Sequence, residues 1–422
     1  MWDGLHWWVG TPSMEMVARR AMRAIASHGA TDIAYDAKRG VVNCTVSGNA
    51  SMVLLANVHA DVLRAPRRHR EDVIRRFVAA VVLPVDDKPP ASYEQARARL
   101  MPIVRTLADD AFAVLTAERL DSAAGAPDDG ARMASRRIAG DLIAGVAYDS
   151  PQAMQRITGD QLARWGVTLD QVLDDAIQTL RALPEHGGWR ALGDGLWSGE
   201  WGDSYESSRV LLPDLIHRLG VADPVVLMPL RHSLLVASAR NERGLLAMAA
   251  KARRLMEENT RWLSLQPLAL TAQGWQPFTP PDAARPAFED LLCVEQASTC
   301  NEQKVLLEEI NERGGVDVFV ADVSVVRQRE DGRLCSYCVW SQDVDTLLPH
   351  AHLVVFDAAV DGHGQGGERE LLPVRWDDVQ AIAGALMTPT RHAPPRWRVS
   401  AFPDAAQWAR LKAVEAQMAP PP

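Results

Sequence analysis

The spacing of apolar residues predicts a mixture of helices and short strands in the first part of the chain. Apolar positions recur at helical intervals after Thr11-Pro12, where proline suits the first turn of a helix. Two short runs at 32–36 and 41–46 predict strands joined by a turn, and 52–56 predicts a third strand. Residues 71–82 return to helical spacing.

Two loops interrupt this pattern. Residues 84–92 and 121–131 are rich in turn-forming or small residues, so neither predicts a regular element. The segment between them, 93–120, is apolar enough to pack but suits a helix or a strand equally. Residues 141–149 predict a strand.

Two helices after this strand carry recognisable starting signals. Thr158 with Gln161, and Thr168 with Gln171, have the spacing of capping boxes, in which a threonine hydroxyl accepts a backbone hydrogen bond. Gly166 between them suits the end of the first helix.

Further elements are predicted around the segment from Gly199 to Pro213. Strands are predicted at 189–197 and 265–271, and a pair of strands at 225–228 and 233–237. Helices are predicted at 204–219 and 241–258. Pro213 is expected to kink or restart its helix, because proline lacks a backbone donor. Pro267 is expected to keep the last strand at a sheet edge for the same reason.

A proline-rich segment at 276–287 predicts a linker to a second region. Glu330-Asp331-Gly332 predicts a hairpin turn between two strands there. The predicted helices and strands are 301–313, 316–327, 333–340, 352–356, 371–375, 377–386 and 405–414.

The order of these elements favours an α+β fold with mainly antiparallel sheets, because strands and helices do not alternate regularly. We expect two regions, 1–278 and 288–422, with a possible internal boundary near 121–131. The length of 422 residues suits two or three domains.

Composition narrows the expected partners and compartment. The net charge of -9 disfavours nucleic acid, which needs a basic face, and the basic run at 64–76 is interpreted as a solvated helix face. Five unevenly spaced cysteines do not form a disulfide framework and suit a reducing compartment. The longest apolar run, 77–83, is too short to cross a membrane, and the first ten residues lack a secretory leader. We therefore expect a cytoplasmic protein.

The segment from Gly199 to Pro213 resembles an element of the uncharacterised YtpQ-like bacterial family, Gly-Asp-x-Tyr-(Asp/Glu)-Ala-Ser-Arg entering a helix. The resemblance extends over about residues 14–278, and a strand pair follows the element in both. Ser207 replaces the usual alanine, and His232 stands where the family has an acid after Arg231. Because the family's function is unknown, the resemblance implies an organisation and not an activity.

This element supplies the candidate binding residues. They are Trp201, Asp203, Tyr205, Glu206, Ser208 and Arg209, together with Arg231 from the strand pair. One interpretation is structural: Ser204 caps a helix, and an acid or carbonyl groups hold Arg209. Glu206, three residues before Arg209, is one available acid. The other is a cleft in which Tyr205, Arg209 and Arg231 bind an anion.

Other motifs predict no metal or cofactor. Cys335 and Cys338 are three apart on a predicted strand, so their side chains point to opposite faces. His350 and His352 lack further ligands nearby, and the glycine-rich run 362–367 lacks the lysine and hydroxyl residue of a phosphate loop. No catalytic motif is recognisable.

These observations lead to two functional hypotheses. The acidic charge, the 13 tryptophans and the missing catalytic motifs favour a non-enzymatic protein-binding module, immunity- or chaperone-like, that masks a toxin or secreted protein. The alternative is an enzyme or small anionic-ligand binder.

Overall fold

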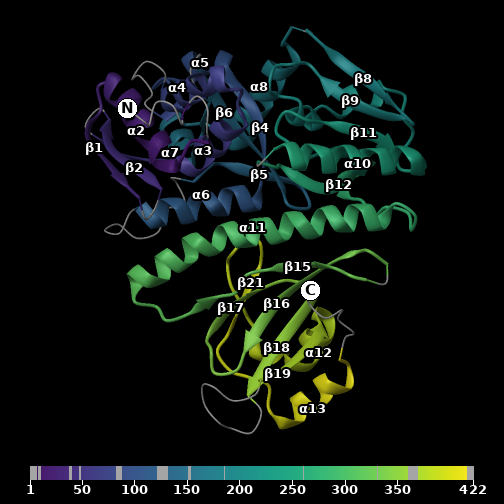
Figure 1. Ribbon diagram of the computed structural model, residues 1–422. Coiled ribbons are helices and arrows are strands. Elements are labelled where there is room, and N and C mark those ends of the chain that lie inside the picture. Colours follow the sequence, from purple (N-terminus) through teal and green to yellow (C-terminus); the bar gives the residue numbers. More distant parts are fainter. Residues whose placement is uncertain are drawn as a thin grey trace. The chain divides into compact units, whose positions relative to one another are not determined.

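A computed structural model describes residues 7, 11–37, 40–46, 49–81, 88–120, 132–150, 154–184, 186–259, 261–329, 331–359 and 369–415 (Figure 1). The fold is α+β, with helices beside mainly antiparallel sheets, as predicted. None of the described helices is both long and apolar enough to cross a membrane.

The chain divides into two compact units, Met1–Pro102 with Val146–Thr179 and Ile103–Gly145 with Leu180–Pro422. The division falls within three elements, β4 (Leu100–Thr106), β6 (Leu142–Asp149) and α8 (Leu169–Arg181). It does not coincide with the predicted regions 1–278 and 288–422, and that division stays a prediction.

The first unit contains a three-stranded antiparallel sheet and several helices. Its strands are β1 (Thr31–Asp36), β2 (Val41–Val46) and β3 (Asn49–Leu54), and its helices are α2 (Met14–Ser27), α3 (Leu55–Arg64), α4 (Arg70–Val81), α5 (Tyr93–Ala96) and α7 (Gly159–Trp165). Helices α2, α3 and α4 bury apolar side chains in one core with the sheet. Strand β7 (Met154–Arg156) pairs antiparallel with β6.

Helix α2 starts later than predicted. Ser13 caps it by accepting a hydrogen bond from the Met16 amide at 3.3 Å, so Pro12 precedes the cap and Thr11 does not serve as one. The predicted strand at 52–56 is also shorter, since α3 begins at Leu55. Leu55, Val58 and Val62 are all buried, at helical spacing.

Of each predicted capping box, the threonine half is present, whereas the Gln161 side chain accepts from Arg164 at 2.8 Å. The Thr158 hydroxyl accepts from the Gln161 amide and the Thr168 hydroxyl from the Gln171 amide, each at 3.3 Å. Gly166 ends α7 at a φ of 66°, a conformation that glycine adopts without strain.

The second unit contains a six-stranded antiparallel sheet in the order β13-β12-β10-β11-β9-β8. The strands are β8 (Gly188–Gly193), β9 (Leu196–Glu200), β10 (Pro224–Met228), β11 (Leu235–Ser238), β12 (Ser264–Thr271) and β13 (Gly274–Pro277). Alternate residues of β10 face opposite cores: Val225 and Leu227 pack with α10 (Glu242–Glu258), and Val226 and Met228 pack on the other face.

Two predictions for this sheet are wrong. Residues 189–197 form a hairpin and not one strand, because Asp194 and Gly195 both take positive φ and turn the chain. Strand β12 lies inside the sheet, between β10 and β13, although it contains Pro267. The register between β10 and β12 shifts between Val226 and Met228, and this irregularity accommodates the missing donor.

Helix α11 (Arg285–Gly314) is the longest element and starts well before the predicted residue 301. Pro286 sits in its first turn, so the proline-rich segment is partly helix start and partly β13. Phe288 and Leu291 pack with the six-stranded sheet, whereas Ala297 and Cys300 pack in the C-terminal core. Figure 1 shows the helix between these two sets of strands.

Two four-stranded sheets form the C-terminal part of this unit. One has the order β15-β16-β18-β19 and the other β14-β17-β21-β20. The strands are β14 (Phe319–Val320), β15 (Ser324–Arg327), β16 (Leu334–Ser341), β17 (Thr346–Pro349), β18 (Leu353–Ala359), β19 (Arg369–Arg375), β20 (Thr388–Pro389) and β21 (Arg396–Val399).

The hairpin predicted at 330–332 is confirmed, because Arg327 pairs with Leu334 and Gly332 takes a φ of 71°. The predicted strand 316–327 is instead two short strands. Helices α12 (Trp376–Ala383) and α13 (Ala405–Ala413) pack against this core. Elsewhere in the unit, α6 (Leu107–Leu120) packs with α11, and β5 (Ser135–Ala139) contributes Ala139 to a core on the six-stranded sheet.

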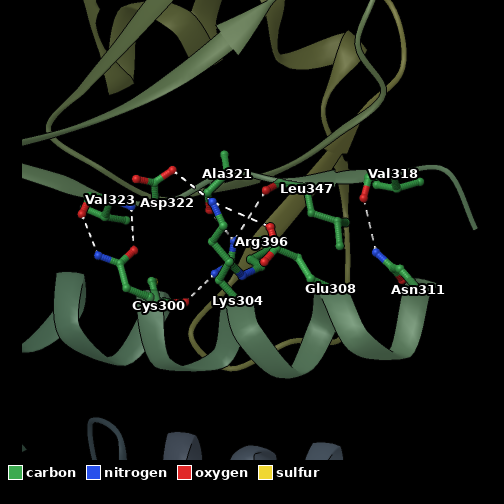
Figure 2. Close-up of polar contacts among 11 residues, drawn as sticks. Cys300, Lys304, Glu308, Asn311, Val318, Ala321, Asp322, Val323, Leu347 and Arg396 are labelled. Atoms are coloured by element: carbon green, nitrogen blue, oxygen red, sulfur yellow. Dashed lines mark hydrogen bonds and ion pairs between the residues drawn. The ribbon is translucent and has the colours of Figure 1, made fainter. Parts of the chain in front are cut away.

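A buried arginine joins α11 to the C-terminal strands. Arg396 of β21 is fully buried and donates to the carbonyl oxygens of Cys300 at 2.7 Å and Ala321 at 2.9 Å. Figure 2 shows further polar contacts along the same helix, including Lys304 with Asp322. The helix is therefore fixed by directed hydrogen bonds as well as by apolar packing.

Candidate functional site

The segment 201–217 is not the single helix predicted at 204–219. Gly202 and Ser204 take positive φ, of 73° and 67°, so the chain turns there and Ser204 does not cap a helix. A short 3-10 helix follows at Ser207–Leu211, and α9 (Pro213–His217) begins afresh at Pro213. The restart at Pro213 matches the prediction, because proline cannot continue the preceding hydrogen bonds.

Asp203 and Arg209 form the central ion pair of this segment. The two terminal nitrogens of Arg209 donate to the two carboxylate oxygens of Asp203, at 2.9 and 2.6 Å. Arg209 therefore pairs with Asp203 and not with Glu206, the acid available at helical spacing, because the chain here is not α-helical. Burial alone would raise the pKa of Asp203, but hydrogen bonds from Arg209 and the Tyr205 amide outweigh it and lower that pKa.

Trp201 covers this ion pair. The guanidinium carbon of Arg209 lies 4.2 Å from the centre of the Trp201 ring, and Trp189 meets the same ring edge-on with centroids 5.0 Å apart. A side chain at Gly199 would lie 2.4 Å from the Trp201 ring, so glycine is required there.

The backbone of Arg231 holds the 3-10 helix in place. Its carbonyl oxygen accepts from the Ser207 hydroxyl at 2.6 Å, which fastens the 3-10 helix to the loop between β10 and β11. Its guanidinium donates to Asp109 at 3.3 Å. Arg209 and Arg231 are thus each engaged by a carboxylate, Asp203 and Asp109 respectively.

A cavity of about 500 Å³ that is open to solvent lies beside this segment. Its walls come from the end of β9, the loop between β10 and β11, helix α10 and the approach to β8. The lining residues are His186, Ser198, Gly199, Glu200, Trp201, Gly202, Glu206, Leu230, His232, Ser233, Lys251 and Leu255.

Of the seven predicted site residues, Trp201 and Glu206 line this cavity. Asp203 and Arg209 support its wall from behind Trp201, while Tyr205 and Ser208 are buried outside the lining. Lys251 and His186 were not predicted, because they lie far from the element in sequence. His232, which departs from the family pattern, also lines the cavity.

Glu206 has an unsatisfied carboxylate oxygen. The residue is only 4% exposed, and its Oε1 accepts from the Gly202 amide at 2.8 Å. Its Oε2 is buried and has no hydrogen-bond partner among the described residues. A buried carboxylate oxygen without a donor is costly, so this atom is prepared to accept a hydrogen bond from a molecule in the cavity.

The other candidate motifs have structural partners. Cys335 and Cys338 are buried and free, and burial raises the pKa of both thiols. His350 contacts the side-chain amide of Gln296, and the His352 ring accepts from the Ser336 amide. The described part of the chain contains no group of acids, histidines and cysteines arranged to hold a metal. The glycine-rich run 362–367 lies outside the described residues.

No protein-family model, curated protein or solved structure matches this chain. The resemblance to the YtpQ-like family therefore stays a prediction.

Proposed function

We propose that this chain binds a small polar molecule in the cavity beside residues 198–206. A hydrogen-bond donor of that molecule binds the carboxylate of Glu206. The observation that carries the proposal is the buried Oε2 of Glu206, which lines the cavity and has no partner among the described residues. An amine is the most complementary donor, since it bears a positive charge opposite a carboxylate.

The cavity suits a ligand of this kind. Its volume of about 500 Å³ lies within the range of small-molecule sites. Leu230 and Leu255 supply apolar surface, while Ser198 and Ser233 add hydroxyl groups. The Asp203–Arg209 pair fixes the Trp201 wall, so this side of the site is held before a ligand arrives.

This proposal modifies the small-ligand alternative formulated from the sequence. Arg209 already donates from both terminal nitrogens to Asp203, so recognition of an anion by Arg209 is not part of it. The acceptor Glu206 takes the central role instead.

The protein-binding hypothesis, with an immunity- or chaperone-like role in the cytoplasm, stays a prediction. Its tryptophan argument loses weight, because every tryptophan that the structure describes is buried or half-buried. Those rings contribute apolar surface to the packing of the described residues.

The test is a thermal-shift titration with ethanolamine and pentylamine. We expect both amines to raise the melting temperature of the natural protein and to have little effect on Glu206→Gln, whose amide places a donor against the amine. Glu200→Gln is the matched control, since Glu200 lines the cavity but pairs with Arg190 at 2.5 Å. The proposal is contradicted if neither amine shifts the natural protein, or if Glu206→Gln responds equally.

A further inference from the structure

Lys251 brings a second charge to the cavity that contains Glu206. It lies on α10 with Leu255 one turn later, and both side chains line the cavity. Lys251 is half-buried and forms no ion pair or hydrogen bond with the residues that the structure describes. Its ammonium group therefore has unused donors beside the cavity.

The remaining charges around the cavity are already balanced or exposed. Glu200 pairs with Arg190, and His186 and His232 are exposed at the rim. Glu206 and Lys251 are thus the two lining residues with opposite charges and unused capacity. They do not form an ion pair with each other, so the Lys251 ammonium nitrogen and the Glu206 carboxylate oxygens lie more than 4.0 Å apart, and both side chains line the same cavity.

We propose that the ligand is zwitterionic, an inference that rests on the proposed amine site at Glu206. Its ammonium group binds Glu206, and a compact anionic group, a carboxylate or a phosphate, binds Lys251. The chain between the two charges lies along Leu230 and Leu255. Lys251 is then the residue that distinguishes a zwitterion from a simple amine.

Isothermal titration with two matched pairs of probes tests this inference. The first pair is 5-aminopentanoate and pentylamine, which differ by a carboxylate. The second is phosphoethanolamine and ethanolamine, which differ by a phosphate. We expect the zwitterion of at least one pair to bind about tenfold tighter than its amine, and the pair that shows the advantage identifies the anionic group.

Lys251→Gln is expected to abolish that advantage, while the simple amine binds at least as tightly as before because a positive charge has left the cavity. Lys251→Arg is expected to retain most of it, because the charge remains. Arg243→Gln removes an exposed positive charge from the first turn of the same helix and is the matched control. It is expected to keep the full advantage.

The outcomes separate this inference from the proposed function. If the amines bind and neither zwitterion is favoured, or if the advantage persists in Lys251→Gln, the inference is wrong and the Glu206 site stands. If neither amines nor zwitterions bind the natural protein, both are wrong.

Discussion

Asp203 and Arg209 join the two ends of a turn by a pair of hydrogen bonds, at 2.9 and 2.6 Å, beneath the Trp201 ring. The Arg209 side chain is 5% exposed and that of Asp203 22%. A charge pair in this setting matters mainly through the cost of losing one member, because the other is then left without its partner.

Replacing Arg209 by alanine is therefore expected to reduce the free energy of unfolding by about 3 kcal/mol. Urea denaturation followed by tryptophan fluorescence measures the change. Arg190→Ala, which breaks the exposed pair with Glu200, is the control and is expected to cost less than about 1 kcal/mol. Equal stability of the two variants would show that the Asp203–Arg209 pair contributes no more than a surface contact.

Gly199→Ala tests whether the Trp201 wall is needed for the cavity. The added methyl group would lie 2.4 Å from the ring, so Trp201 must move. We expect a loss of about 2 kcal/mol in stability, together with a loss of amine binding. Gly188→Ala is the control, since no atom lies within 4 Å of its added methyl group. A Gly199→Ala protein with natural stability and natural amine affinity would contradict this role of the wall.

Arg396 is expected to stabilise the contact between α11 and the C-terminal strands. Arg396→Met would take the Arg396 donors away from the buried carbonyl oxygens of Cys300 and Ala321, at an expected cost of about 3 kcal/mol in chemical denaturation. Arg398→Met, two residues along the same strand and half-exposed, is expected to cost less than about 1 kcal/mol. If Arg396→Met were instead more stable, the burial of the charge would outweigh its hydrogen bonds.

The stability of the protein is expected to depend on pH through Glu295 of α11. Burial raises the pKa of Glu295 well above its ordinary value, and the nearby carboxylates of Asp141 and Asp109 raise it further, although the Leu265 amide donates to it at 3.0 Å. Because this pKa is higher in the folded state than in the unfolded state, the protonated Glu295 carboxyl group favours the folded protein. This contribution to stability is present at low pH and is lost as the pH rises through the folded pKa.

Glu295→Gln mimics the protonated acid and can still accept from Leu265. Its melting temperature is therefore expected to exceed that of the natural protein, by a margin that grows between about pH 5 and about pH 8. The exposed Glu312 lies on the same helix, and Glu312→Gln is expected to change the melting temperature little at either pH. A margin that shrinks with rising pH would show that the carboxyl group titrates in the opposite sense.

Local signals predicted much of the fold. Threonine caps, the Gly332 turn and the pairing of β10 with β11 depend on residues close in sequence, and the structure contains all three. Helix α11 was predicted too short because its two halves bury side chains in different cores, which obscures a single apolar face. Pro267 was placed wrongly at an edge, because a register shift can accommodate a missing donor inside a sheet.

The sequence located the segment that borders the candidate site but not the way in which the site is formed. Trp201 and Glu206 belong to the predicted element and line the cavity. The pairing of Asp203 with Arg209 follows from positive φ at Gly202 and Ser204, which no helical spacing anticipates. Lys251 approaches only through the packing of α10 on the sheet, so a tertiary contact and not a local pattern brings it to the cavity.

The central claim is that Glu206 Oε2 receives a donor from a bound molecule. Isothermal titration of pentylamine into the natural protein, Glu206→Gln and Glu200→Gln tests it most directly. The account predicts that Glu206→Gln weakens binding by at least about tenfold, while Glu200→Gln binds within about twofold of the natural protein. Equal affinity of Glu206→Gln and the natural protein would contradict the account.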